Sequence, residues 1–312
     1  MVATAVDAPL RIENAQKRYG KVTALAGVSF DVRPGELVGL LGPNGAGKTT
    51  AIKAIAGRVA LDGGQVHLFG RALAPRDSRP EIGVVPQELA VYAKLTAREN
   101  LEVFGALNGV GRATLKTRVD WALEWSDLKD RADEITQKYS GGMRRRLNIA
   151  CSLLHDPKIV LLDEPTVGVD PQSRERIYEM LAALQKRGVS VVLTTHHLEE
   201  AEQRCERILI IDHGRIVASG TLEELVRSTL GSARAVNLTV DSAWPAGVAV
   251  PAGARVGENG RSIHADLPDL GGSLARLIDD VGRAGRSVTD IKLTGSTLHE
   301  VFIALTGREL RE

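Results

Sequence analysis

The stretch GELVGLLGPNGAGKTT, residues 35–50, decides the fold of this 312-residue chain. An apolar run at residues 37–41 leads into a turn that contains three glycines, and a helix-like stretch follows the turn. The turn fits the pattern GxxxxGK[ST], in which backbone N–H groups and a helix N-terminus bind phosphate. Because the apolar run is continuous, it predicts a strand buried on both faces and therefore an α/β fold.

Four more runs of this kind are expected in the same sheet, and they cover residues 81–87, 158–165, 189–196 and 207–214. The strand signal disappears between about residues 96 and 154, where Thr96 and Glu99 form a capping box that opens a helix. We therefore expect an all-helical insertion within an α/β domain of residues 1–228. From about residue 229 the chain is rich in Gly, Pro and Ala. Short strands and helices then predict a small α+β domain over residues 229–312.

Composition argues against several classes of protein. Lys and Arg total 40 against 39 Asp and Glu, so a general nucleic-acid binder is not expected. The two cysteines, Cys151 and Cys205, lie far apart, so neither a disulfide framework nor a zinc site is expected. The N-terminus does not resemble a signal peptide, and the apolar runs are too short to span a bilayer. If the protein acts at a membrane, we expect another chain to span it.

The glycine-rich turn is the candidate phosphate site. Lys48 is expected to neutralise the β- and γ-phosphates, and the Thr49 hydroxyl is expected to bind Mg²⁺. The alternative is a glycine-rich turn with a chance lysine. The residues expected to contact a nucleotide here are Gly42, Asn44, Gly45, Ala46, Gly47, Lys48, Thr49 and Thr50.

Two acidic residues, Asp163 and Glu164, end the run IVLLDEP at the edge where α/β sheets bind ligands. Asp163 is expected to hold Mg²⁺, and Glu164 is expected to orient and polarise the water that attacks the γ-phosphate. The alternative is a strand that ends in two solvated acids. Gln87 follows another predicted strand and could reach the Mg²⁺ or the attacking water, and His196 ends a further strand and could reach a γ-phosphate. Tyr19 could stack on adenine, although each of these three signals is weak alone.

The order of these elements along the chain resembles that of ATP-binding cassette (ABC) ATPases, over about residues 10–229. YSGGM, residues 139–143, is similar to the signature sequence of that family, usually LSGGQ, and departs from it at Tyr139 and Met143. The resemblance implies that two cassettes meet head to tail and share two ATP molecules. Ser140, Gly141 and Gly142 would then grip a γ-phosphate held mainly by a second copy of the chain, with Asp170 contacting that copy near the catalytic site.

Three arginines follow the signature, at positions 144, 145 and 146. On a helix they point in directions about 100° apart, so they cannot form one patch. We expect them to be solvated or paired with Asp and Glu, and we do not expect contact with nucleic acid.

The resemblance implies an ATP- and Mg²⁺-dependent ATPase at the cytoplasmic face of the cell membrane. It would power efflux through a separate transmembrane permease subunit, which would dock near Gln87 and the helical insertion. The tail at residues 296–310 is similar to that of drug-resistance exporters of the daunorubicin type, which suggests an antibiotic or multidrug substrate. The alternatives are a lipid or glycan exporter, an importer ATPase, and a soluble cassette ATPase that acts on ribosomes or DNA.

Overall fold

The computed structural model describes residues 8–74, 77, 79–231, 234–245, 247–257, 259–267, 270–294 and 297–307. The chain divides into two compact units between Thr221 and Leu222. The sequence places the domain boundary at residues 228/229 instead, because the Gly- and Pro-rich composition begins there. The boundary at residues 228/229 remains a prediction of where one independently folding domain ends and the next begins.

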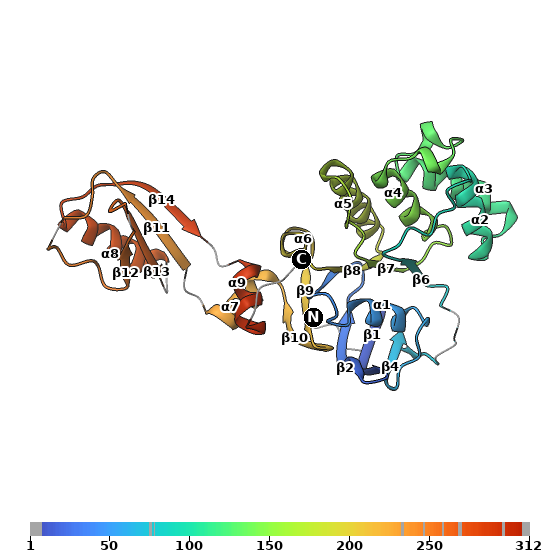
Figure 1. The fold of residues 1–312 in the computed structure, drawn as a ribbon, viewed down its shortest axis with the longest axis horizontal. Helices are drawn as coiled ribbons and strands as arrows, with labels where there is room; N and C mark the ends of the chain where they lie inside the picture. Colours follow the sequence, from blue (N-terminus) through green and yellow to red (C-terminus); the bar gives the residue numbers. More distant parts are fainter. Residues whose placement is uncertain are drawn as a thin grey trace. The chain divides into compact units, whose positions relative to one another are not determined.

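The core of the first unit is a six-stranded sheet with the order β10-β9-β3-β8-β7-β6 (Figure 1). The strands are β3 (Leu37–Leu41), β6 (Ile82–Val85), β7 (Ile159–Asp163), β8 (Ser190–Thr195), β9 (Arg207–Asp212) and β10 (Arg215–Gly220). Neighbouring strands from β9 to β6 are parallel, and only β10 pairs in the antiparallel sense. Every residue of β3, β7 and β8 is buried, as their continuous apolar runs predict.

Helices cover both faces of this sheet. α1 (Lys48–Ile55) packs on one face, with Ala51, Ile52 and Ile55 in a shared hydrophobic core. α5 (Pro171–Lys186) packs on the opposite face. The separate hydrophobic core there contains the strand side chains that point away from α1, because side chains alternate between the two faces of a sheet. α6 (Leu198–Arg204) packs against β3 and β8.

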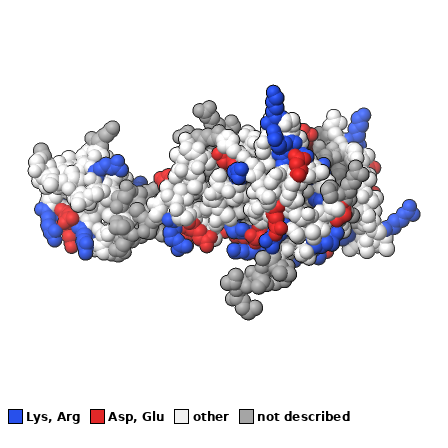
Figure 2. Space-filling model, turned by 90° about the horizontal axis from the view of Figure 1, so that it is seen from below, with Lys and Arg blue, Asp and Glu red and all other residues white. Residues whose placement is uncertain are grey.

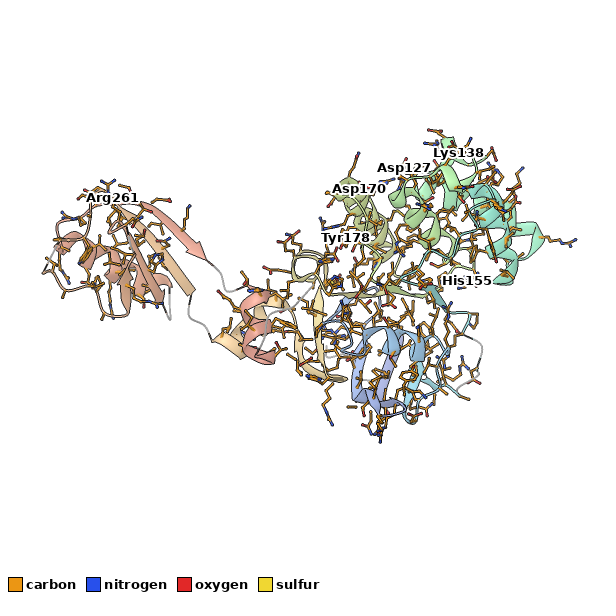
Figure 3. The ribbon with its side chains drawn as sticks, viewed as in Figure 1. Asp127, Lys138, His155, Asp170, Tyr178 and Arg261 are labelled. Atoms are coloured by element: carbon orange, nitrogen blue, oxygen red, sulfur yellow. The ribbon has the colours of Figure 1, made fainter. Side chains whose placement is uncertain are left out.

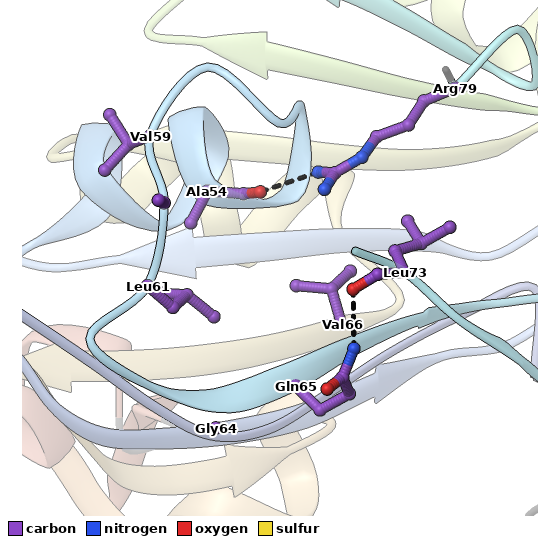
Figure 4. A pocket seen from close by; sticks show the side chains of 9 residues that line it. Ala54, Val59, Leu61, Gly64, Gln65, Val66, Leu73 and Arg79 are labelled. Carbon is purple, nitrogen blue, oxygen red and sulfur yellow. Dashed lines mark hydrogen bonds between the residues drawn. The ribbon is translucent and has the colours of Figure 1, made fainter. Parts of the chain in front are cut away.

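A second, antiparallel sheet with the order β2-β1-β4-β5 closes over α1. Its strands are β1 (Leu10–Tyr19), β2 (Val22–Val32), β4 (Gly63–Leu68) and β5 (Arg71–Ala72). A cavity of about 80 Å³ lies between this sheet and the end of α1 (Figure 4). At its rim Arg79 donates a 2.7 Å hydrogen bond to the carbonyl of Ala54, so a cation satisfies the C-terminal end of α1.

The helices expected between residues 96 and 154 are α2 (Ala97–Leu107), α3 (Arg112–Trp125) and α4 (Gly141–Cys151), joined by the 3₁₀ turns Lys129–Arg131 and Thr136–Lys138. They share a hydrophobic core of their own, which includes Leu101, Leu123 and Leu147. Both bonds of the capping box between Thr96 and Glu99 are present at the start of α2. These helices position the signature sequence at the N-terminus of α4.

The second unit contains a four-stranded antiparallel sheet with the order β12-β13-β11-β14. Its elements are α7 (Leu222–Leu230), β11 (Arg234–Val240), β12 (Ala254–Val256), β13 (Ser262–Leu267), α8 (Leu270–Arg283), β14 (Val288–Thr294) and α9 (Leu298–Thr306). In α9 the side chains of Leu298, Val301 and Phe302 are buried, whereas Leu305 is only partly buried. Of the tail that suggested a drug-exporter branch, Ser296 and residues 308–310 lie outside the described residues.

In the part of the chain that the structure describes, no helix is both long enough and apolar enough to cross a bilayer. On the face shown in Figure 2, basic and acidic side chains lie intermixed.

Candidate active site

The glycine-rich turn joins the end of β3 to the start of α1, as its sequence pattern predicts. Gly45 and Gly47 have positive φ angles of 83° and 109°, which L side chains rarely adopt. A Cβ atom on Gly42 would lie 2.2 Å from the carbonyl oxygen of Ile211, and one on Gly47 would lie 2.4 Å from that of Ala24. The backbone can therefore follow this path only with glycine at these positions.

Beside the turn lies a cavity of about 280 Å³. Of the expected nucleotide contacts, Asn44, Gly45, Gly47, Lys48, Thr49 and Thr50 line it, together with Gln87 and Glu164. Gly42 and Ala46 are not among its lining residues. The side chain of Ala46 is only 3% exposed, and its N–H donates to the Pro43 carbonyl at 3.1 Å, so this residue helps to fix the turn.

Lys48 is held at the base of this cavity and is 4% exposed. Its ammonium donates to the carbonyl oxygens of Gly42 and Pro43 at 2.7 and 3.2 Å, and Nζ lies 3.2 Å from Oε1 of Glu164. The Glu164 carboxylate therefore balances this buried positive charge, and the two carbonyls accept its remaining hydrogen bonds.

Oxygen ligands suited to a hard cation meet beside the cavity. Thr49 Oγ1 lies 3.2 Å from Oδ1 of Asp163, and Thr194 Oγ1 donates to the same carboxylate oxygen at 2.7 Å. The described residues contain no cluster of three or more His, Cys, Asp or Glu side chains that could hold a metal alone. This donor set fits Mg²⁺, which takes one or two protein oxygens and fills its other positions with phosphate oxygens and water.

Glu164 stands at the centre of the expected catalytic group. Its φ angle of 47° is unusual for a residue other than glycine, and its N–H donates to Thr194 Oγ1 at 3.0 Å. Gln87 Nε2 donates to Oε2 of Glu164 at 3.1 Å, and His196 Nδ1 lies 3.1 Å from Oε1. The structure thus brings Glu164, Gln87, His196 and Lys48 together from four separate segments.

The pKa of Glu164 lies below its ordinary value of 4.5. Burial of the carboxyl group raises this pKa, but the neighbouring His196 and Lys48 lower it by more. Glu164 is therefore ionised at neutral pH, and a carboxylate at this position can accept a hydrogen bond from a water molecule and orient it.

Two apolar residues on the rim of the cavity were missed by the sequence reasoning. Val22 and Ala24, at the start of β2, line the cavity, whereas Tyr19 does not. Tyr19 is 48% exposed and lies directly opposite Val22 in the β1–β2 hairpin, so its cross-strand neighbour lines the cavity. Thr194, which holds both Asp163 and Glu164, was also missed. A threonine after an apolar run carries little signal by itself.

The signature residues do not line this cavity in the part of the chain that the structure describes. Ser140 caps α4, since its side chain accepts from the Met143 N–H at 3.2 Å. A Cβ atom on Gly142 would lie 2.0 Å from Ser173 Oγ and 3.2 Å from Asp170 Oδ2. Asp170 itself caps α5 by accepting from the Ser173 N–H at 2.9 Å, and it lies at the start of that helix in Figure 3.

The arginines after the signature are not equivalent. Arg146 pairs with Asp127 at 3.3 Å, in line with the expected pairing with an acidic residue, although its side chain is only 11% exposed. The expectation is wrong for Arg145, which is 5% exposed and donates to the backbone carbonyls of Pro86 and Gln87 at 3.0 and 2.6 Å. Burial lowers the pKa of Arg145. Two carbonyl groups rather than an acid satisfy its buried charge.

The sequence around this site is similar to those of known proteins. Residues 25–167 match the family model described as ABC transporter. The linearmycin resistance ATP-binding protein LnrL of Bacillus subtilis is 39% identical over 97% of this chain and 100% of its own length. The daunorubicin resistance ATP-binding protein DrrA3 of Streptomyces coeruleorubidus is 37% identical over 98% of each chain. The Nod factor export ATP-binding protein I of Ralstonia nicotianae is 37% identical over 97% of this chain and 95% of its own.

A solved structure shares the fold of the first unit. It is the dimeric post-hydrolysis state of an ATP-binding cassette bound to ADP and Pi. It superimposes with a TM-score of 0.62 and 28% identity, over 68% of this chain and 98% of its own.

Proposed function

This chain belongs to the ABC transporter family of ATP-binding proteins, and from that premise we propose that it is the ATP-hydrolysing subunit of an exporter. The exported compound is an antibiotic or a related small molecule, because the relatives named for linearmycin and daunorubicin resistance match almost the whole chain. The observation that carries the proposal is the convergence of Lys48, Gln87 and Glu164 at one cavity beside the phosphate-binding turn.

The cavity suits the polyphosphate of ATP. Backbone N–H groups of the turn and the N-terminus of α1 present partial positive charge to the β- and γ-phosphates, and the ammonium of Lys48 adds a full charge. Thr50 and Asn44 border the same space. Tyr19 and Val22, which are exposed on the β1–β2 hairpin, would pack against the adenine ring.

Thr49 and Asp163 are the residues that would hold Mg²⁺, with Gln87 as a further oxygen ligand. When bound there, Mg²⁺ neutralises charge that develops on the phosphate oxygens. Thr194 keeps the Asp163 carboxylate oriented toward Thr49 through its 2.7 Å hydrogen bond.

Glu164 acts on the attacking water. Because its pKa is lowered, the carboxylate is charged at neutral pH and can accept a hydrogen bond from water in line with the γ-phosphate. Gln87 and His196 contact its two oxygens, so they fix the direction of the carboxylate. His196, the residue that follows β8, would also reach a γ-phosphate.

Ser140, Gly141 and Gly142 serve the ATP of a second copy of the chain. They form the N-terminus of an 11-residue helix, where N–H groups attract phosphate, yet they do not line the cavity described above. Ser140 and Gly141 are exposed and available to another molecule. Asp170, at the exposed start of α5, would contact the same partner.

A permease docks in the groove beside the Gln87 loop. This groove, of about 240 Å³, is lined by Ile82 and Val84 of β6, Phe104 and Leu107 of α2, and residues of α4 including Asn148. Leu107 is 71% exposed, and Nδ2 of the buried Asn148 has no hydrogen-bond partner in the described residues. A cytoplasmic segment of the permease with an apolar side chain and a carbonyl acceptor would satisfy both. The chain would therefore lie at the cytoplasmic face of the cell membrane.

The proposal is tested with Glu164→Gln in the full-length chain. This change keeps the shape of the side chain but removes the charge that orients water, so we expect hydrolysis to fall by about 100-fold or more. ATP and Mg²⁺ should then hold a stable dimer, measured by light scattering after size exclusion. A variant that remains monomeric with ATP and hydrolyses it normally would contradict the proposal.

The Nod factor relative supports a second candidate, a glycan or lipid exporter, at the same 37% identity as the daunorubicin relative. The two candidate functions are distinguished by expressing the chain with its permease in antibiotic-sensitive cells. Protection against antibiotics favours the first candidate. Release of a lipid-linked glycan without protection favours the second.

A further inference from the structure

The loop that carries Gln87 is fastened to the signature helix. Arg145 donates from both terminal nitrogens to consecutive carbonyls of this loop, those of Pro86 and Gln87, at 3.0 and 2.6 Å. Asn148 lies three residues further along α4, on the same face, and its Oδ1 accepts from the Ala90 N–H at 3.0 Å. Both side chains are at least nine-tenths buried, with 5% and 3% exposed. Residues 87–90 are exposed, and these three bonds fix that loop to α4.

Gln87 connects this attachment to the catalytic group. Its carbonyl is held by Arg145, while its side-chain Nε2 donates to Glu164 Oε2 at 3.1 Å. A shift of Arg145 therefore moves the backbone of the residue whose side chain orients Glu164. Arg145 is therefore connected to the Glu164 carboxylate through a single residue, Gln87.

The other end of α4 is the signature sequence. Ser140 caps the helix, and Arg145 follows five residues later, which is about 7.5 Å along a helix axis. α4 is a continuous helix whose core residues Leu147 and Ile149 are fully buried. A displacement of its N-terminus would therefore be carried along the hydrogen-bonded helix to Arg145.

We propose that Arg145 is a positioning residue that couples the two ATP sites of the dimer, an inference that rests on the proposed function. In that dimer the N-terminus of α4 contacts the ATP held by the partner, and Gln87 contacts the ATP held by its own chain. When the partner's ATP binds at the N-terminus of α4, Arg145 changes the position of Gln87 and therefore of Glu164 at the chain's own ATP. Arginine suits this role because its planar fork reaches two acceptors at once, whereas lysine offers one ammonium.

Arg146 provides a matched control. It is the next residue on the same helix and is largely buried, with its side chain 11% exposed. Its partners are the carbonyls of Ser126 and Asp127 and the Asp127 carboxylate, all at the end of α3. Removal of its charge thus costs contacts inside the helical region and leaves the Gln87 loop untouched.

The experiment compares Arg145→Met, Arg145→Lys and Arg146→Met in the full-length chain. Initial rates of hydrolysis are measured against ATP concentration, and affinity for one nucleotide is measured separately with a fluorescent ATP analogue. We expect wild type to show a Hill coefficient approaching about two, the number of sites in the dimer. Arg145→Met should bring it close to one and lower kcat, because Gln87 then no longer holds Glu164 in its working direction. Affinity for the analogue should stay within about twofold, because no phosphate contact is lost.

Arg145→Lys keeps the charge but places all its donors on one nitrogen, and it should give intermediate values even if the methionine variant folds poorly. Arg146→Met should keep the cooperativity of wild type. Equal loss of cooperativity in the Arg145 and Arg146 variants would overturn the proposal, because helix stability alone would then explain it. Wild-type cooperativity in both Arg145 variants would overturn it as well. Failure of the proposed function is recognised separately, because Glu164→Gln with an intact Arg145 would then form no dimer with ATP.

Discussion

The ammonium of Lys48 lies 3.2 Å from the carboxylate of Glu164, and both side chains are more than nine-tenths buried. The residue expected to bind phosphate and the residue expected to orient water thus stabilise each other's charge. Lys48→Met removes one charge and keeps most of the volume. We expect affinity for ATP to fall by about 10- to 100-fold, as for the loss of a hydrogen bond to a charged group.

The matched control is Lys53→Met, which changes an exposed lysine on the same helix. Isothermal titration with ATP and Mg²⁺ measures both variants. If Lys53→Met weakened binding as much as Lys48→Met, general surface charge rather than the buried ammonium would be responsible.

A buried ion pair between Glu36 and Arg207 makes the stability of the first unit depend on pH. Arg207 Nε and Nη2 donate to the two carboxylate oxygens at 2.7 and 2.9 Å, and the residues are 4% and 8% exposed. Burial raises the pKa of Glu36, but Arg207 and the Arg33 N–H lower it by more, to below the ordinary 4.5. The carboxylate therefore stabilises the fold above pH 4.5, and this contribution is lost as the pH falls through the lowered pKa.

The variant Arg207→Met leaves the Glu36 charge buried and unpaired. We expect a loss of about 3–5 kcal/mol in the free energy of unfolding at pH 7, measured with urea. Without Arg207, burial should raise the Glu36 pKa, so the variant regains stability as the pH falls toward 4.5. Wild type loses stability only as the pH falls through its lowered pKa, so the difference between the two should shrink as the pH falls. A difference that stayed constant from pH 7 to pH 4 would contradict the assignment.

The sequence predicted the buried sheet well and the outer sheet not at all. β3, β7 and β8 are uninterrupted apolar runs that end in polar residues, so their positions follow from the chain itself. β1 reads LRIENAQKRY and pairs with β2 through several register shifts, so its side chains do not alternate regularly. Burial of that strand depends on α1 and β4, which pack against it from distant parts of the chain.

The same distinction holds at the site. Lys48, Asp163 and Glu164 occur in motifs whose chemistry is local, so the sequence alone was sufficient to propose them as site residues. The role of Thr194 depends on contacts with residues about 30 positions away. The burial of Arg145 depends on two carbonyls 58 and 59 positions away, and no pattern around the arginine reveals them.

Gly142 is confined by α5, and this gives a prediction about stability alone. A Cβ atom there would lie 2.0 Å from Ser173 Oγ, whereas one on Gly141 would meet nothing closer than the Gly168 carbonyl at 3.9 Å. Gly142→Ala should therefore lower the free energy of unfolding by about 1–3 kcal/mol, the usual cost of overpacking. Gly141→Ala should be neutral or slightly stabilising, because alanine favours helix over glycine.

Urea unfolding of the two single variants and of Gly142→Ala combined with Ser173→Gly measures this effect. The second change removes the side-chain atoms that clash, so it should restore part of the lost stability. Equal destabilisation by alanine at 141 and at 142 would show that the packing against Ser173 is not the cause.

Glu200 ties the two loops that flank the catalytic carboxylate. Its oxygens accept from Thr166 Oγ1 at 2.6 Å and from Thr195 Oγ1 at 2.8 Å, and it is 5% exposed. Thr166 lies two residues after Glu164, and Thr195 immediately precedes His196. Glu200→Ala leaves two buried hydroxyls without their acceptor, which should cost about 2–4 kcal/mol of stability. It should also lower kcat, because both loops lose their common anchor.

Glu200→Gln separates these two effects. Its amide oxygen can replace one acceptor, and its NH₂ group can donate to the oxygen of the other threonine hydroxyl, which reverses that hydrogen bond without leaving the side chains unpaired. We therefore expect near-normal stability, a KM for ATP within about twofold of wild type, and a kcat lowered about tenfold, the effect of roughly one lost hydrogen bond in the transition state. Glu199→Gln, at the exposed neighbouring position, is the control and should match wild type in both stability and rate. If Glu200→Gln hydrolysed ATP at the wild-type rate, the carboxylate would serve only to stabilise the fold, and the alignment of the two loops would have to come from the backbone bonds at Thr194 and Thr195 instead.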